Sequence, residues 1–147
     1  MRRLFIMRKD LNMSPGKLAA QVSHCAEAYW TRGLRNYAKP LDDYAGYEIK
    51  GIIDKEIFEQ YLNGSFTKTI CEARNKNHLL KAVKIAQELG LIENVHYGLI
   101  YDACLTELTP EENGTTLTGI WFCPLKDDMA HYISKKISII SLIIYCK

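Results

Sequence analysis

Several features that would assign the chain to a special class are missing from its 147 residues. No apolar run approaches the ~20 residues that a membrane-spanning helix needs. Arg8 interrupts the apolar stretch at the N-terminus before it reaches the length of a secretory signal. The five cysteines are odd in number and form no CxxC pair, which argues against a disulfide scaffold or a zinc site. With 48% hydrophobic and 24% charged residues, the sequence predicts a globular, cytoplasmic domain with reduced thiols.

Acidic residues are scarce in the first 40 positions, where only Asp10 and Glu27 occur against eight Lys and Arg. This segment has a net charge of +6, so the remainder has −4. The asymmetry indicates a polyanionic partner that meets the face built by the N-terminal segment. A solvated basic surface without a partner is the alternative interpretation.

The hydrophobic pattern alternates strands with helices. Strands are expected at 3–9, 65–73, 95–103 and 115–122, and helices at 15–32, 75–89 and 125–136. Such alternation predicts an α/β fold with a mixed, mostly parallel four-stranded sheet that helices cover on both faces. The fourth strand follows the third without a helix between them, so we expect it to run antiparallel.

The whole of 1–147 is interpreted as one domain with two irregular parts. Residues 34–64 mix Pro, Gly, Asp and Tyr, and we expect an insertion there: a loop, then a short helix over 54–64. The first helix is expected to close near Gly33, just before this insertion. The apolar tail at 137–147 is atypical, and it is expected to form either an extra edge strand or a segment buried against a partner.

A strand end, a tight loop and an amphipathic helix are predicted in succession between Arg8 and Trp30. Ser14 is a suitable N-cap, and Pro15 suits the first helical position. The free N–H groups of the first turn form a local anion site, to which Lys17 adds a full positive charge.

Three polar side chains, Lys17, Gln21 and His24, lie at helical spacing on one stripe of that helix. On spacing alone, this stripe is either an ordinary surface or one wall of a site. If the first and third strands run parallel, Asp10, the Lys17 turn and Asp102 emerge at the same edge of the sheet. The carboxyl ends of strands are where open α/β sheets place their ligand sites.

The segment RKDLNMSPGKLAAQVSHCA (8–26) resembles the type 2 peptidyl-tRNA hydrolase family. The shared elements are a strand ending in R-x-D-L, an M-x-x-G-K turn, and a helix with A-A-Q-x-x-H. A second segment, YDACLTELTPEENGTTLTGIWFCP (101–124), is similar to the family's D-A-G-R-T segment, its loop and the following strand. The order and the spacing of the two segments agree with the family.

The resemblance implies a fold and a reaction. The fold is a three-layer α/β/α sandwich with a mixed four-stranded sheet, often a homodimer. The implied enzyme is cytoplasmic, needs no metal or cofactor, and acts in translation and ribosome rescue. Its reaction is hydrolysis of the ester that joins a peptide to the terminal ribose of tRNA, its partner and substrate.

The resemblance also implies the site residues. The catalytic set is His24, Lys17, Asp102 and Thr106. The resemblance further implies that Thr116 binds substrate. The other predicted substrate-binding residues follow from the helix start, the polar stripe, the strand end and the basic segment: Gly16, Gln21, Asp10, Arg8, Lys9 and Arg32. Histidine is the usual general base at neutral pH, while Asp102 orients the imidazole or holds the attacking water; the choice of base between them stays open. Lys17 stabilises the oxyanion or binds the terminal phosphate.

The basic residues of the N-terminal segment are expected to supply most of the affinity for tRNA. The side chains assigned to phosphates are Arg2, Arg8, Lys9, Arg32 and Arg35. Phosphate contacts of this kind predict binding that is sensitive to salt and nearly independent of tRNA sequence.

Three positions depart from the family pattern. The glycine and arginine that follow D-A in the family are Cys104 and Leu105 here, and Glu72 stands where the family has a lysine. Glycine at the first position serves a backbone conformation that is expected to strain Cys104. The departures motivate two alternatives: a non-catalytic relative that binds tRNA or protein, and a thiol hydrolase that uses Cys104 with His24 and Asp102.

Overall fold

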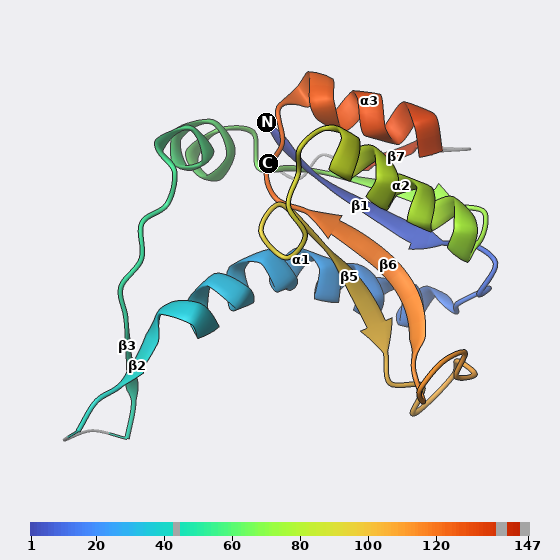
Figure 1. Cartoon of the computed structure of the whole chain (residues 1–147), viewed down its shortest axis with the longest axis horizontal. Helices are drawn as coiled ribbons and strands as arrows, with labels where there is room; N and C mark the ends of the chain where they lie inside the picture. The colour runs from blue at the N-terminus through green and yellow to red at the C-terminus, as the bar shows by residue number, and fades with distance from the viewer. Residues whose placement is uncertain (43–44, 138–140, 145–147) are drawn as a thin grey trace.

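The computed structural model describes residues 1–42, 45–137 and 141–144, with the backbone alone for the last range. Its element order is β1 (Arg2–Arg8), α1 (Pro15–Tyr37), β2 (Ala38–Pro40), β3 (Tyr47–Ile49), η1 (Ile57–Ser65), β4 (Thr67–Ala73), α2 (Lys76–Glu88), β5 (Tyr97–Asp102), β6 (Thr116–Phe122), α3 (Asp127–Ile137) and β7 (Ser141–Ile144). The main sheet has the strand order β5-β6-β1-β4-β7, and β2 pairs with β3 in a separate hairpin (Figure 1).

The hydrophobic core has two parts, one on each face of the main sheet. Successive side chains of a strand point to opposite faces. Leu4 and Ile6 of β1 are fully buried in a cluster with residues of α2 and α3. Phe5 and Met7 belong to a second cluster with residues of α1. α1 therefore covers one face of the sheet, and α2 and α3 cover the other (Figure 1).

The α/β class and the mixed sheet are confirmed, but the expectation of a mostly parallel sheet needs correction. The pair β1–β4 is parallel, whereas β1–β6, β5–β6 and β4–β7 are antiparallel. β1, β4 and β5 do run in the same direction, yet β6 enters between β1 and β5. The fourth predicted strand is antiparallel, as expected, and its insertion at that place removes the second parallel pair.

The start of α1 forms as its sequence predicts, while its end lies further along. The Ser14 hydroxyl accepts a hydrogen bond from the Lys17 amide at 3.3 Å, and Pro15 is the first helical residue. α1 continues through Gly33 to Tyr37 because Gly33 keeps helical geometry within the helix. The glycine therefore lowers helix propensity without ending the helix.

Replacing Gly33 should stabilise the protein. A Cβ atom built at Gly33 meets no atom within 4 Å. We expect Gly33→Ala to raise the free energy of unfolding by about 1 kcal/mol, because alanine loses less backbone entropy than glycine in a helix. Urea unfolding of the two proteins measures this difference. A lower midpoint for Gly33→Ala would mean that α1 does not continue through this position.

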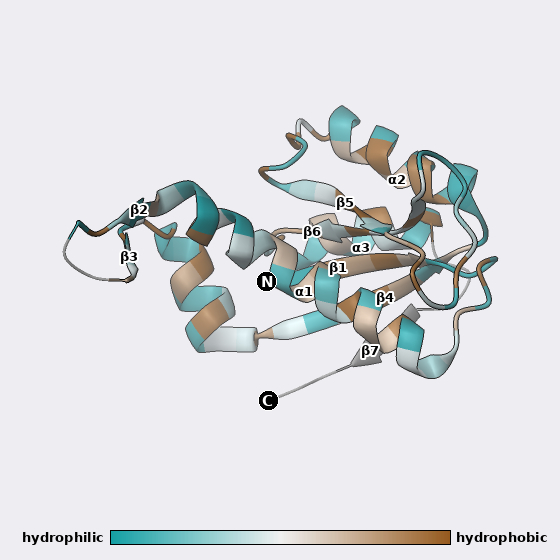
Figure 2. Cartoon of the chain, turned by 90° about the horizontal axis from the view of Figure 1, so that it is seen from below, coloured by the Kyte–Doolittle hydropathy of each residue, from teal (hydrophilic) through white to brown (hydrophobic). Residues whose placement is uncertain are grey.

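The insertion contains an element that the sequence does not reveal. β2 and β3 pair antiparallel in a hairpin that projects beyond the end of α1 (Figures 1 and 2). Strands of three residues are too short to show an alternating pattern, so the sequence predicts only a loop here. The predicted short helix is present as η1, and the Asp54 carboxylate accepts from the Ile57 amide at 3.0 Å. η1 is a π-helix, the type in which an amide donates to the carbonyl five residues back. The amide of its C-cap residue, Phe66, donates to the Tyr61 carbonyl in this way.

The tail contributes an edge strand over Ser141–Ile144, where β7 pairs with β4. This agrees with one of the two alternatives for the tail. The rest of that expectation, over 138–140 and 145–147, lies outside the described residues. Within the described residues, no helix has both the length and the apolar character needed to cross a membrane.

Candidate active site

A lysine, a carboxylate and a hydroxyl meet where α1 begins and β5 ends. The Lys17 ammonium lies 2.7 Å from Asp102 Oδ2 and 3.2 Å from the Thr106 hydroxyl. Lys17 comes from the first turn of α1, Asp102 is the last residue of β5, and Thr106 follows in the loop. The Lys17 side chain is 14% exposed. The cluster is therefore partly shielded from water yet open to a ligand.

Gln21 and Thr118 form a chain of buried hydrogen bonds that ends on Asp102. The buried Gln21 amide nitrogen donates to Asp102 Oδ2 at 2.6 Å, and its oxygen accepts from the Thr118 hydroxyl at 2.6 Å. A carboxylate only accepts hydrogen bonds. Gln21 must therefore turn its NH₂ group toward Asp102 and its oxygen toward Thr118, which fixes the rotation of the amide.

Sequence reasoning missed Thr118 because an irregularity in the sheet places it. The pairing of β5 with β6 shifts between Ile100 and Tyr101, whose partners are Gly119 and Leu117. Thr118 is thus the extra residue of a β-bulge, a feature that redirects side chains next to sites. A bulge leaves no recognisable pattern in a single sequence.

Hydrogen bonds hold Asp102 in its charged form. Burial favours the neutral acid, but hydrogen bonds from Lys17, the Cys104 amide and Gln21 outweigh burial, so the pKa of Asp102 lies below its ordinary value. The Cys104 amide donates to Oδ1 at 2.8 Å. A carboxylate with a lowered pKa is a weak proton acceptor. Asp102 is therefore better suited to fix the lysine than to act as the general base.

Cys104 has the backbone strain that the family's glycine would avoid. Its φ is +55°, in the left-handed region that favours glycine. The thiol donates to the Asp102 carbonyl at 3.4 Å. The left-handed turn lets the Cys104 amide face the Asp102 carboxylate. The backbone of Cys104 thus contributes to the cluster more directly than its sulfur.

Replacing Cys104 by glycine distinguishes the strained turn from a catalytic thiol. We expect Cys104→Gly to stabilise the protein by up to about 1 kcal/mol, because relief of the left-handed strain outweighs the additional chain entropy that glycine loses on folding. Hydrolytic activity should be retained. Thermal unfolding and an ester-hydrolysis assay measure the two effects. Complete loss of activity in this variant would favour the thiol hydrolase.

The anion site predicted at the start of α1 is occupied by a side chain of the protein. The Glu107 carboxylate accepts from the Ser14 amide at 2.5 Å and from its hydroxyl at 2.6 Å. These hydrogen bonds, together with the charge of Lys17, lower the pKa of Glu107. A phosphate binding here would have to displace Glu107. Sequence reasoning missed this residue because the contact joins positions 93 residues apart.

His24 lies beside the cluster rather than within it. It is exposed on α1, one turn beyond Gln21, and its imidazole forms no hydrogen bond or ion pair with any other described residue. It lines a groove of about 510 Å³ together with Arg32 and Arg35 of α1 and Tyr101 of β5. Tyr101 precedes Asp102, so the groove begins next to the cluster. The structure does not pair His24 with Asp102.

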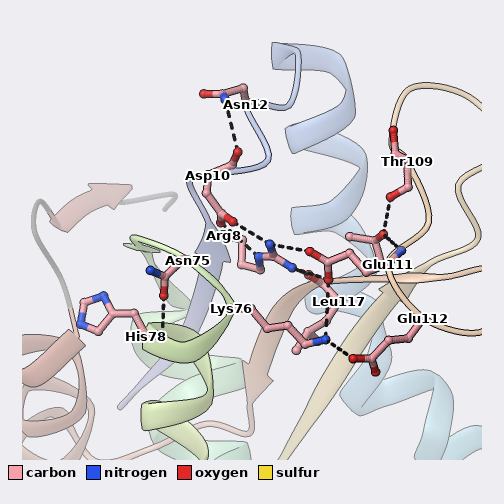
Figure 3. A network of polar contacts seen from close by, with 11 residues as sticks. Arg8, Asp10, Asn12, Asn75, Lys76, His78, Thr109, Glu111, Glu112 and Leu117 are labelled. Carbon is pink, nitrogen blue, oxygen red and sulfur yellow. Dashed lines mark hydrogen bonds and ion pairs between the residues drawn. The ribbon is translucent and has the colours of Figure 1, made fainter.

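Arg8 is not available to a phosphate, which corrects its predicted role. Its side chain is 3% exposed and lies 2.6 Å from Asp10 and 2.8 Å from Glu111 (Figure 3). It also donates to the Leu117 carbonyl at 3.0 Å. The hydrogen bond with Asp10 is the largest of the effects that raise the pKa of Arg8. Asp10 neutralises Arg8, and the ion pair of Arg8 with Glu111 connects β1 to the 103–115 loop.

Most other cations of the N-terminal segment also have partners within the protein. Lys9 pairs with Glu72 at 2.8 Å, so the acidic residue that departs from the family lysine neutralises a neighbouring lysine. Arg2 pairs with Asp127, and the fully buried Arg3 donates to main-chain carbonyls. The net charge of a segment therefore overstates the charge offered to a ligand.

Arg32 and Arg35 differ from these residues. Across 1–42, 45–137 and 141–144, neither guanidinium forms a hydrogen bond or an ion pair, and both residues line the groove. Gly16 is exposed at the start of α1, with open space around it.

Thr116 has a structural environment, which corrects its assignment to substrate binding. It is fully buried, its hydroxyl donates to the Thr109 carbonyl at 2.7 Å, and it accepts from the Glu111 amide at 3.1 Å. Both contacts close the loop that leads into β6. Thr116 therefore shapes the loop, while Thr118 reaches the cluster.

The fold and the cluster together define an α/β protein with a lysine–carboxylate site at the carboxyl ends of two strands that run in the same direction. The sequence model of the family described as peptidyl-tRNA hydrolase PTH2 matches residues 1–140. Because this match spans nearly the whole chain, the protein belongs to that family.

Relatives named peptidyl-tRNA hydrolase are similar over most of both chains. The protein of Thermococcus sibiricus is 27% identical over 140 residues, 95% of this chain and 97% of its own. That of Methanopyrus kandleri is 29% identical over 109 residues, 74% and 75% of the two chains. That of Thermoplasma acidophilum is 22% identical over 130 residues, 88% and 90%.

Proposed function

We propose that this protein hydrolyses the ester bond of peptidyl-tRNA at the Lys17–Asp102 cluster. The observation that carries the proposal is the ammonium of Lys17, which Asp102 holds in place within the segment matched by the family model. The groove with His24 and two arginines runs along the same helix. A fixed positive charge in a partly shielded place is what an ester carbonyl needs as its oxygen becomes negative.

The reaction is attack of water on the ester carbonyl. The water oxygen bonds to the carbonyl carbon, Lys17 stabilises the resulting oxyanion, and the bond to the ribose oxygen then breaks. The water gives one proton to a base, and the ribose oxygen gains one as tRNA leaves, so peptide and tRNA are the products. Asp102 and Gln21 hold Lys17 in place.

We assign the base to His24. Three hydrogen-bond donors surround the Asp102 carboxylate, which makes it a poor proton acceptor. The imidazole of His24 is exposed in the groove that begins next to Asp102, without a partner among the described residues. The Thr106 hydroxyl accepts a hydrogen bond from the Lys17 ammonium, and it can also bind a water molecule beside that ammonium.

The test is deacylation of N-acetyl-aminoacyl-tRNA by the wild type and by His24→Ala. We expect the wild type to release tRNA and His24→Ala to be slower by about 100-fold, the usual contribution of a general base. A wild-type protein that binds this tRNA without cleaving it would instead be the non-catalytic relative. An unchanged rate in His24→Ala would remove His24 from the mechanism.

A further inference from the structure

A second cavity lies beyond the groove, where the insertion folds back on α1. It has a volume of about 450 Å³, and we call it the insertion pocket. Its walls are the second half of α1, the end of β3 with the segment 51–54 that follows it, and the 94–95 loop. Gly51 approaches the ring of Tyr37 so closely that an added Cβ would lie 3.2 Å from it. The insertion is thus fitted to α1 here.

The insertion pocket and the groove form one continuous surface. Four residues line both cavities: Arg32, Asn36, Asn94 and Trp121. α1 rises about 1.5 Å per residue, so the pocket around Gly33 lies roughly 24 Å along the helix from Lys17. A polymeric ligand whose reacting end lies at Lys17 would reach the pocket only with a residue or nucleotide several positions away from that end.

The side chains of this surface match a single-stranded nucleic acid. Trp30 and Tyr37 offer aromatic rings in the pocket, and Tyr37 is 52% exposed, whereas Trp121 is buried. Arg32 stands at the junction of the two cavities, and Arg35 lies in the groove, both without an ion-pair partner in the described part of the chain. Sites for single strands combine aromatic rings, on which bases stack, with cations along the backbone.

We propose that the insertion pocket binds a base of the unpaired 3′ end of the substrate tRNA, while Arg32 and Arg35 bind the phosphates that lead to it. This inference rests on the proposed function, because it places the ribose ester at Lys17. An apolar peptide would also suit the aromatic walls, but it offers no fixed negative charge to the two arginines. The unpaired 3′ end of a tRNA offers both a base for the aromatic rings and phosphates for the two arginines.

The pocket can be filled without changing its charge. Gly33 lines it, and a Cβ there has open space. Gly33→Leu extends an apolar side chain from that wall, and Gly33→Ala adds a single carbon at the same place. The probe is a fluorescent single-stranded RNA hexanucleotide that ends in CCA, and its binding is followed by anisotropy.

We expect Gly33→Leu and Trp30→Ala each to weaken binding of this RNA by about fivefold to 100-fold, the range found for loss of one stacked base. Gly33→Ala should have the smaller effect of the two glycine variants. Arg32→Ala should also lower the slope of log K against log salt by about 0.7, as for one lost phosphate contact on a single strand. The exposed Lys39, which lines neither cavity, provides the control Lys39→Ala.

Wild-type affinity in Gly33→Leu and Trp30→Ala, with both variants folded by circular dichroism, would overturn the proposal. Unchanged RNA binding together with a raised KM for tRNA that carries an apolar peptide would assign the pocket to the peptide instead. The hexanucleotide contains no ester, so its binding is independent of turnover. RNA binding that depends on Gly33 in a protein that cleaves no ester would keep the pocket and reject the hydrolase.

Discussion

Replacing Lys17 by methionine is expected to lower kcat for ester hydrolysis by about 100-fold to 1000-fold, the cost of removing one preorganised oxyanion donor. Lys17 lies 2.7 Å from Asp102 and its side chain is 14% exposed, so its ammonium is a held charge that is partly shielded from water. Methionine has a similar length and fills the same space without the ammonium. KM should change less than kcat, because the interaction strengthens as negative charge develops.

The matched control is Lys126→Met, which removes the same charge from a different surface. Lys126 is 62% exposed and pairs with Glu56 at 3.4 Å. We expect its kcat and KM to equal those of the wild type. If Lys17→Met affected only KM, Lys17 would bind a phosphate of the substrate and would not stabilise the oxyanion.

Replacing Arg8 by methionine is expected to cost about 3 kcal/mol of folding free energy, the lower limit of the range for breaking a buried ion pair. Arg8 is 3% exposed, but its partners Asp10 and Glu111 are 35% and 32% exposed, so water can partly solvate them. The change also leaves the Leu117 carbonyl without its donor at 3.0 Å. Urea unfolding measures the loss.

Arg2→Met is the control from the other end of β1. Arg2 lies 2.7 Å from Asp127, whose side chain is 56% exposed, so solvent weakens this ion pair. We expect a loss below about 1 kcal/mol for such a surface pair. Equal losses for the two variants would contradict the structural importance given to Arg8.

The Arg8 network should also appear in the pH dependence of stability. The hydrogen bond from Arg8 is the main cause of the lowered pKa of Glu111. A lowered carboxyl pKa contributes stability above the ordinary value near 4.3, and this stability is lost as the pH falls below it. Unfolding free energy of the wild type should therefore fall on acidification below about pH 5, and it should fall less in Arg8→Met. Parallel curves would contradict this origin.

Patterns within short segments of the sequence predict most of the helices and strands and the residues that α1 contributes to the site. The N-cap of Ser14 and the stripe of Lys17 and Gln21 follow from spacing within one helix. The role of the segment around Asp102 follows from its resemblance to the family. The positive φ of Cys104 follows from its place where the family has a glycine. Each of these features depends on residues close together in the chain.

The remaining features depend on contacts between distant segments, which a single sequence does not display. Glu107 reaches Ser14, Glu111 reaches Arg8, and Thr118 reaches Gln21 through a β-bulge. The same limit explains the overestimated basic face, since pairing partners such as Glu72 and Asp127 come from other elements. Counting charges along the chain cannot show which of them neutralise one another.

The most direct test of the Lys17–Asp102 site is the single-turnover rate of Asp102→Asn on N-acetyl-aminoacyl-tRNA with enzyme in excess. Asparagine keeps the size of the side chain but loses the charge that holds Lys17 at 2.7 Å. We predict a rate at least about 100-fold below that of the wild type, with tRNA still bound. A rate within about threefold of the wild type would show that ester cleavage occurs elsewhere in the protein.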